Sequence, residues 1–494
     1  MPTGLLFSLI IAYFFILLFV SWRTGRNSNN ESFFIGNRNS NWMLVAFGMI
    51  GTSLSGVTFV SVPGAVGKSA FAYMQVTFGY MIGYILIAFI LLPLYYRLKL
   101  TSIYDFLRTR MGMRSYKTGA LFFIISRLVG ATARLYLVIN ILQTTILEQY
   151  HIPFWVSALI ILGMVIAYTY EGGVKTIVWT DTLQTSCMLL GLIICTVFIL
   201  NNLHLNIGES LSAMHEKGYT RIFNTDINSS NFFIKQILAG AFITITMTGI
   251  DQEMMQKSIS VKNLKDSKKN MVTLAFIMVV VIGMFLYLGG LLYLFAGREH
   301  ITVSGDPLFP EIALHHMTPF ISVIFVIALI SALFPSADGA MTALTSSICI
   351  DMMGINRKDK AKFPEWDDNK KKRTRQRVHL IVAFLFLVLV LIFKIINDQS
   401  MIGVILKLAG YTYGPLLGLF AFGIFTKRKV NDALVPVICL LSPVICFFID
   451  NYQHLLFGNF QIGLELIVIN GLLTFLGLLF ISRQSSVNRY SSDN

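Results

Sequence analysis

Apolar runs of about 20 residues recur from one end of this 494-residue sequence to the other, and each is long enough to cross a ~30 Å hydrocarbon core as a helix. Hydrophobic residues make up 55% of the chain and charged residues 13%, too few to cover a soluble protein of this length. We therefore predict an all-α integral membrane protein without a large water-soluble domain. Its predicted spans are 4–22, 42–66, 71–96, 118–147, 153–170, 174–201, 232–256, 271–296, 319–353, 378–396, 401–426, 433–450 and 462–482, thirteen in all.

Basic residues are concentrated in every second loop. If the loop after residue 22 is cytoplasmic, cytoplasmic loops hold 30 of the 39 Lys and Arg residues, Lys257 and Lys262 among them. The opposite loops hold five, including Lys235, and four lie within spans. Cytoplasmic loops of membrane proteins carry such an excess. We therefore predict a plasma-membrane protein with Met1 outside and Asn494 in the cytoplasm. The same rule accounts for the net charge of +14 without a nucleic-acid partner.

Two predicted spans contain residues that interrupt a helix. The span 42–66 contains Gly56 among several Ser and Thr residues. The span 232–256 contains Gly249 shortly before Asp251. Glycine, and polar side chains that bond to the backbone, weaken a helix at such points.

Each interrupted span opens a block of five spans, residues 42–201 and residues 232–426. Because five is odd, the second block enters the membrane from the opposite side. Interruptions at matching positions of two inverted repeats are typical of secondary transporters, whose binding sites lie at the breaks. The alternative is that these small residues only allow neighbouring helices to pack closely.

Several short motifs are then informative together. They are Phe33-Phe34-Ile35-Gly36-Asn37-Arg38, Leu54-Ser55-Gly56, Pro63-Gly64, Gly172-Gly173, Trp179-Thr180-Asp181-Thr182-Leu183-Gln184, Asp251-Gln252 with Gln256, Ser336-Ala337-Asp338, Ser346-Ser347 and Asp351. With these motifs the chain resembles the sodium:solute symporter family over nearly its whole length. The resemblance implies a leucine-transporter-like fold, with a 5+5 inverted-repeat core and three peripheral spans.

The family also implies a sodium site where the break in span 42–66 meets span 319–353. The resemblance implies backbone carbonyl ligands at Gly51, Leu54 and Ala332, and hydroxyl ligands at positions 335 and 336. This sequence keeps the hydroxyl of Ser336 but has Pro335 beside it. Proline cannot donate a hydrogen bond to the carbonyl four residues earlier, which is thereby free to replace the missing ligand.

Asp181 lies within the predicted span 174–201 and Asp338 within 319–353. An intramembrane carboxylate is costly and usually functional. Some relatives place the equivalent of Asp181 at a second, inner sodium site. Two carboxylates that face one cavity repel each other unless a cation or proton lies between them, so we predict a second cation site formed by this pair. The alternative for Asp181 is a structural hydrogen bond to a neighbouring helix.

Arg127 and Arg134 are seven residues apart and so share one face of span 118–147. In the implied fold this span lines the substrate cavity, and some sialic acid relatives bind the substrate carboxylate with an arginine there. The alternative is a structural salt bridge, for example to an aspartate of span 174–201 or span 319–353. We assign Arg134 to the solute, with Ser55, Thr58 and Thr248 as further contacts.

These features predict a sodium-coupled symporter, not an enzyme, that imports a small polar solute. A guanidinium in the cavity favours an organic anion such as a carboxylated sugar or a monocarboxylate. We expect no cofactor besides the coupling ion Na⁺, and a monomer surrounded by lipid. The alternatives are a proton-coupled or neutral-sugar symporter of the same fold, and a membrane sensor that has lost transport.

Overall fold

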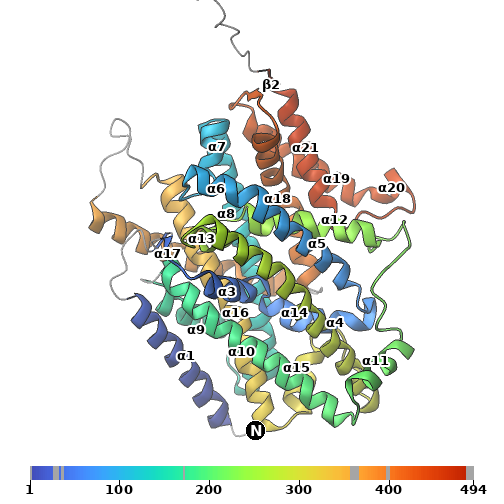
Figure 1. Cartoon of the computed structure of the whole chain (residues 1–494). Helices are drawn as coiled ribbons and strands as arrows, with labels where there is room; N and C mark the ends of the chain where they lie inside the picture. The colour runs from blue at the N-terminus through green and yellow to red at the C-terminus, as the bar shows by residue number, and fades with distance from the viewer. Residues whose placement is uncertain are drawn as a thin grey trace, which may run out of the picture.

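The computed structural model describes residues 3–25, 33–34, 38–170, 173–355, 367–396 and 401–484. Met1, Gly36, Gly172 and Asn494, to which predictions above refer, lie outside these ranges. The described chain is a bundle of helices with one two-stranded pairing, β1 (Lys429–Val430) with β2 (Ser482–Arg483). In Figure 1, α1 lies at the lower left and α19 to α21 at the upper right, so the first and last spans flank the bundle from opposite sides.

The α-helices are α1 (Thr3–Gly25), α3 (Trp42–Ser53), α4 (Gly56–Ser69), α5 (Tyr73–Leu86), α6 (Leu92–Leu98), α7 (Asp105–Arg110), α8 (Met113–Leu142), α9 (Phe154–Thr169), α10 (Gly173–Asn202), α11 (Ile207–Glu216), α12 (Phe233–Thr244), α13 (Gln252–Ile259), α14 (Leu264–Arg298), α15 (Leu308–His315), α16 (Pro319–Ser347), α17 (Asp368–Ile396), α18 (Met401–Phe425), α19 (Val435–Asn451), α20 (Gln453–Phe457) and α21 (Leu466–Phe480). Short π-helical or 3-10 turns extend four of them, at η2 (Ile87–Leu91), η3 (Gln143–Leu147) with η4 (Glu148–Tyr150), η5 (Ile245–Gly249) and η6 (Ile348–Met352).

Eight of the described helices are long and apolar enough to cross a membrane, and two bent helix pairs bring that number to ten. Three shorter apolar helices, α9, α19 and α21, fall on the remaining predicted spans. Every predicted span thus coincides with a helix, and the all-helical, membrane-spanning architecture is confirmed. The count of thirteen crossings stays a prediction, because the three short helices have only 15 to 17 residues.

The two interruptions predicted from the sequence are present as sharp bends. α3 and α4 meet at 57°, and the helix Phe233–Gly249 meets α13 at 67°. At the first bend Ser55 is extended (φ −73°, ψ 172°). At the second, Asp251 is extended and its carboxylate accepts hydrogen bonds from the backbone N–H groups of Glu253 and Met254. Asp251 therefore starts a new helix in the usual manner of an N-cap residue.

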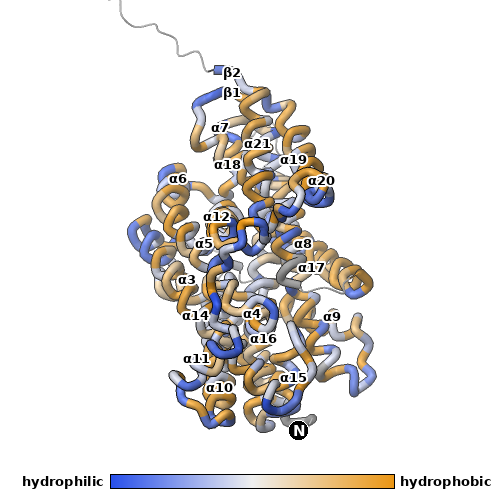
Figure 2. Tube along the Cα trace, turned by 90° about the vertical axis from the view of Figure 1, so that its right-hand side faces the viewer, coloured by the Kyte–Doolittle hydropathy of each residue, from blue (hydrophilic) through white to orange (hydrophobic). Residues whose placement is uncertain are grey.

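The outer surface of the bundle is apolar. Large hydrophobic side chains point outward from peripheral helices, among them Phe15 of α1, Phe384 of α17 and Leu440 of α19, each more than 60% exposed. Figure 2 shows hydrophobic residues along most helices and hydrophilic ones mainly in the connecting segments. Such a surface suits hydrocarbon and not water.

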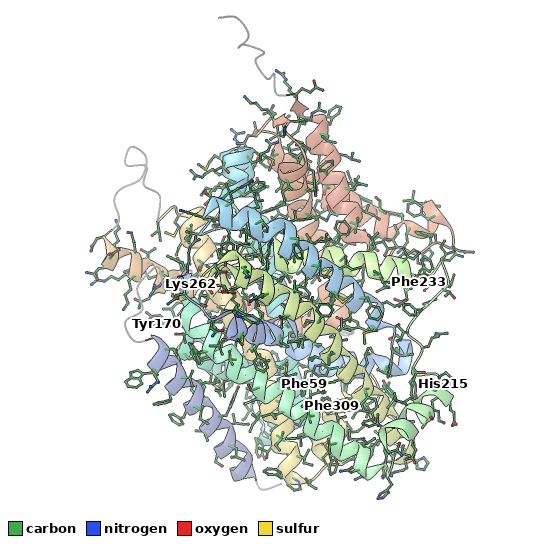
Figure 3. All side chains as sticks on the ribbon, viewed as in Figure 1. Phe59, Tyr170, His215, Phe233, Lys262 and Phe309 are labelled. Carbon is green, nitrogen blue, oxygen red and sulfur yellow. The ribbon has the colours of Figure 1, made fainter. Side chains whose placement is uncertain are left out.

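Two of the segments assigned to the cytoplasm contact each other. The guanidinium of Arg110 donates to backbone carbonyls of Thr426 and Arg428, and Arg114 N–H donates to Asp432, so the loop before α8 packs on the loop before α19. Lys262, also assigned to the cytoplasm, lies on the opposite side of Figure 3 from His215 of the extracellular set. These positions agree with the predicted division of the loops, and which set is cytoplasmic stays a prediction.

Two lysines assigned to loops are in fact buried. Lys235 is in the first turn of α12, where its ammonium donates to the carbonyls of Ser229 and Gln461. Lys257 lies in α13 and is 3% exposed at its side chain. The assignment of Lys257 to a cytoplasmic loop was wrong, because α13 continues inside the bundle after the bend and its residues are buried.

Helices α5 and α12 contact each other through their backbones. A Cβ added to Gly79 would meet the carbonyl oxygen of Ile237, and one added to Gly240 would meet that of Val76. Only glycine permits so close an approach. This glycine seam, Gly79 with Gly240, joins the first predicted repeat to the second. Elsewhere the core is filled by aromatic rings, such as Phe59 of α4 stacked on Phe309 of α15 with centroids 5.3 Å apart (Figure 3).

Candidate substrate cavity and ion-binding region

A polar cavity of about 100 Å³ lies between the two bends. Its wall contains all four residues predicted to contact the solute, Ser55 and Thr58 at the first bend, Arg134 of α8 and Thr248 at the second. Its lining also includes the tyrosines Tyr73, Tyr80 and Tyr84 of α5. The cavity therefore offers hydroxyl groups to a polar ligand, and two arginines of α8, Arg127 and Arg134, contribute to its wall. The tyrosines were missed, because a mid-span tyrosine looks like any core aromatic in the sequence.

Arg134 is partly buried and faces this cavity. In the described part of the chain no carboxylate lies within the 4.0 Å ion-pair distance of its guanidinium. An arginine in such surroundings needs an anionic partner or water to offset the cost of burial. Its planar donor fork matches a carboxylate.

Arg127, on the same face of α8, has its partners within the protein. Its guanidinium forms an ion pair with Glu253 of α13 and lies 3.8 Å from Asp251 Oδ2. Asp251 also accepts a hydrogen bond of 2.9 Å from the Tyr413 hydroxyl of α18. The structural salt bridge considered for Arg127 is therefore real, although its partners belong to the second bend and not to the spans of Asp181 and Asp338.

The first bend offers free backbone oxygens next to α16. Among the described residues, the carbonyls of Gly51 and Leu54 accept no hydrogen bond from the N–H four residues later, because the helix stops between them. A Cβ on Gly51 would lie 3.6 Å from Pro335 Cγ, so this bend packs directly against the proline. Ser336 is buried in α16, one turn after Ala332, and its hydroxyl donates to the Leu333 carbonyl at 2.9 Å. Hard cations take ligands of this kind.

Asp181 of α10 is fully buried and has a basic partner. Its Oδ2 atom lies 2.7 Å from Lys257 Nζ and 3.2 Å from Thr52 Oγ1 of α3. Asp338 of α16, also fully buried, accepts a hydrogen bond of 2.8 Å from the Tyr168 hydroxyl of α9. The second oxygen of each carboxylate has no hydrogen-bond partner within the described structure.

The sequence reasoning missed Glu253 and Lys257. They are four residues apart, a spacing at which acidic and basic side chains pair along a helix, and their side-chain atoms lie 3.5 Å apart. That spacing was a usable signal. It was overlooked because the predicted span ended at residue 256, which placed the lysine in water.

Bent helices around a central polar cavity, inside an apolar bundle, define a membrane transporter. The chain belongs to the sodium:solute symporter family, whose model matches residues 33–438. It is 23% identical over 461 residues to the sodium/sialic acid symporter NanT of Aliivibrio fischeri, covering 91% of this chain and 88% of the relative. It is 22% identical over 495 residues to the sodium/sialic acid symporter SiaT of Proteus mirabilis, covering 95% and 94%.

The fold agrees with that membership. A solved structure of a Na⁺-coupled sialic acid symporter, in a substrate-bound outward-open state, superposes with a TM-score of 0.83 and 18% sequence identity. The match covers 97% of this chain and 99% of that one. The family identified from sequence motifs is thus confirmed, and with it the class of fold.

Proposed function

We propose that this sodium:solute symporter imports a small organic anion, bound through its carboxylate by Arg134. The observation that carries this proposal is a contrast on α8. Both arginines line the cavity, but Arg127 is paired with protein carboxylates, whereas no carboxylate of the described residues lies within ion-pair distance of Arg134. A guanidinium that is desolvated without a partner is unfavourable. A carboxylate ligand removes that cost, whereas a neutral ligand leaves it in place.

The rest of the cavity wall suits the remainder of such a solute. Ser55, Thr58 and Thr248 supply hydroxyls that accept or donate hydrogen bonds. The volume of about 100 Å³ is below the ~300 Å³ of ordinary ligand pockets. A monocarboxylate of a few carbons needs little rearrangement, and a carboxylated sugar of the kind named for the bacterial relatives needs the cavity to open.

Sodium enters, in this proposal, at the first bend. The carbonyls of Gly51, Leu54 and Ala332 and the hydroxyl of Ser336 are the ligands. Pro335 removes one hydroxyl and leaves the carbonyl of Ser331 without the N–H that would otherwise bond to it. The free carbonyls at the bend and its contact with Pro335 support this placement.

The transport cycle proposed here uses two inverted repeats, residues 42–201 and 232–426. Each contributes one bent helix to the cavity, and rocking of one bundle against the other opens the cavity to either side in turn. Sodium moving down its gradient drives the solute into the cytoplasm. The excess of basic residues in every second loop supports an orientation with the N-terminus outside.

Uptake into proteoliposomes tests this function. Radiolabelled pyruvate, lactate and sialic acid are offered with external sodium, and glucose serves as the neutral comparison. We expect accumulation of at least one carboxylate, its loss when choline replaces sodium, and no glucose uptake. Uptake driven equally well by a proton gradient in choline would overturn sodium coupling. Sodium-driven glucose uptake without carboxylate uptake would overturn the anionic substrate.

A further inference from the structure

Lys257 places a positive charge inside the bundle, next to the first bend. Its Nζ atom lies 2.7 Å from Asp181 Oδ2, 2.7 Å from Thr52 Oγ1 and 3.5 Å from Glu253 Oε1. An ammonium group has three protons to donate and accepts none. Three oxygens from three different helices therefore surround it.

The same oxygens would suit a free cation. Carboxylates and hydroxyls are the ligands of hard metal ions as well as of ammonium groups. Thr52 also lines the solute cavity and is two residues before Leu54, at the bend. The ammonium group of Lys257 thus lies where a free cation could bind, next to Thr52 of the cavity wall. Unlike a free cation, it is covalently attached to α13.

The charges of the surrounding residues show why Asp181 depends on Lys257. Asp181 and Asp338 are both fully buried, and Asp338 has the Tyr168 hydroxyl as its hydrogen-bond partner. Arg127 is directed to Glu253 and Asp251. In the described structure Lys257 is the basic side chain that forms an ion pair with Asp181. A buried carboxylate needs such compensation.

We propose that the Lys257 ammonium takes the place of one transported cation at the inner site predicted for Asp181 and Asp338. Sodium then binds only at the first bend. Each transport cycle carries one Na⁺, whereas a transporter with both sites free would carry two. This inference rests on the proposed function, since it specifies the ion coupling of the same transporter. Lys257 is accordingly a residue that determines ion stoichiometry, and it does not contact the solute.

Binding of radiolabelled Na⁺ to the purified full chain tests the proposal without a known solute. Wild-type protein is expected to bind one Na⁺ per chain. In Lys257→Met, Asp181 loses its partner and becomes available to a free ion, so the variant is expected to bind two. In Lys257→Met with Asp181→Asn the extra ion is expected to disappear. Lys394→Met is the matched control, because Lys394 pairs with the amide oxygen of Asn140 at 2.9 Å and not with a carboxylate.

The outcomes are distinct. Two Na⁺ on the wild-type chain would overturn this inference and leave sodium coupling intact, and no Na⁺ on it would overturn sodium coupling as well. An unchanged count in Lys257→Met, or an extra ion that persists in the double variant, would also overturn the inference. If Lys257→Met does not fold, the wild-type count still decides. A larger thermal stabilisation of the Lys257→Met variant by sodium over choline, relative to wild type, is a second expected result.

Discussion

Arg127 and Arg134 lie two turns apart on one face of α8 and line the same cavity, yet they differ in their ion-pair partners. Arg127 is 3% exposed and ion-paired with Glu253, near the carboxylate of Asp251. Arg134 faces the cavity and has no carboxylate within ion-pair distance in the described residues. The first arginine ties α8 to the second bend, and the second remains available. The comparison teaches that two arginines on one helix face can have different roles. The role of each depends on whether a protein carboxylate pairs with its guanidinium.

Removal of Arg127 should have the largest effect on folding. Arg127→Met removes the nearer basic partner of buried Glu253 and leaves it only the 3.5 Å contact with Lys257. Breaking a buried ion pair costs about 3–5 kcal/mol. We expect a strong fall in the yield and apparent melting temperature of the detergent-solubilised protein. Arg134→Met is the control, because no carboxylate of the described residues pairs with Arg134, and it should fold. Equal loss of folding in both variants would contradict the comparison.

Arg134→Lys should have the largest effect on affinity. It keeps the positive charge but loses the fork that bonds to both carboxylate oxygens. The half-saturating concentration of the transported anion should rise roughly tenfold to a hundredfold, the worth of a charged hydrogen bond. Uptake kinetics at saturating sodium measure this, with melting temperature as the check on folding. Normal transport by this variant would move the neutral-substrate reading ahead.

A smaller effect is expected at the first bend. Ser336→Ala removes one of four or five oxygen ligands of the proposed sodium site and no contact to the solute. The sodium concentration for half-maximal uptake should rise about fivefold, equivalent to one ordinary polar interaction. Solute affinity at saturating sodium should stay unchanged. Ser346→Ala, in the same helix, is a suitable control. An unaltered sodium dependence in Ser336→Ala would show that the site is misplaced.

The smallest effect is expected outside the core. Lys407 of α18 lies 2.7 Å from Asp450 of α19, but its side chain is 59% exposed. Exposed ion pairs contribute about 0–1 kcal/mol, and Asp450 keeps the hydrogen bond from the Tyr411 hydroxyl. Lys407→Met should therefore leave melting temperature and solute affinity near their wild-type values. A loss comparable to that of Arg127→Met would mean that exposure does not explain the difference between buried and surface pairs here.

Much of this structure could be predicted from the sequence because it depends on local rules. The apolar runs of the sequence coincide with the apolar helices of the structure. Glycines among Ser and Thr residues predicted the first bend. The resemblance to the family and the interruptions in two spans pointed to the four cavity residues, which the structure brings to one wall. Predicting these features requires only the hydrophobicity of the bilayer, the periodicity of the helix and the resemblance to a known fold.

The ion pairs could not be predicted in the same way. Spacing placed Arg127 and Arg134 on one face, but the carboxylate that separates their roles, Glu253, is 126 positions from Arg127 in the chain. Lys257 was misplaced because a lysine at the end of an apolar run is the usual signal of the membrane surface. Only the direction of α13 after the bend turns that lysine inward, toward Asp181.

The glycine seam between α5 and α12 has a mechanical consequence. Where two helices meet through side chains, rotamer changes give them several ways to fit, and they can slide between these fits. Gly79 and Gly240 bring backbone against backbone, so there is nothing in between to rearrange. We therefore expect the two helices, one from each predicted repeat, to move as one rigid unit. A tilt that begins beside the second bend should then displace the tyrosines of α5 and the cavity wall with them.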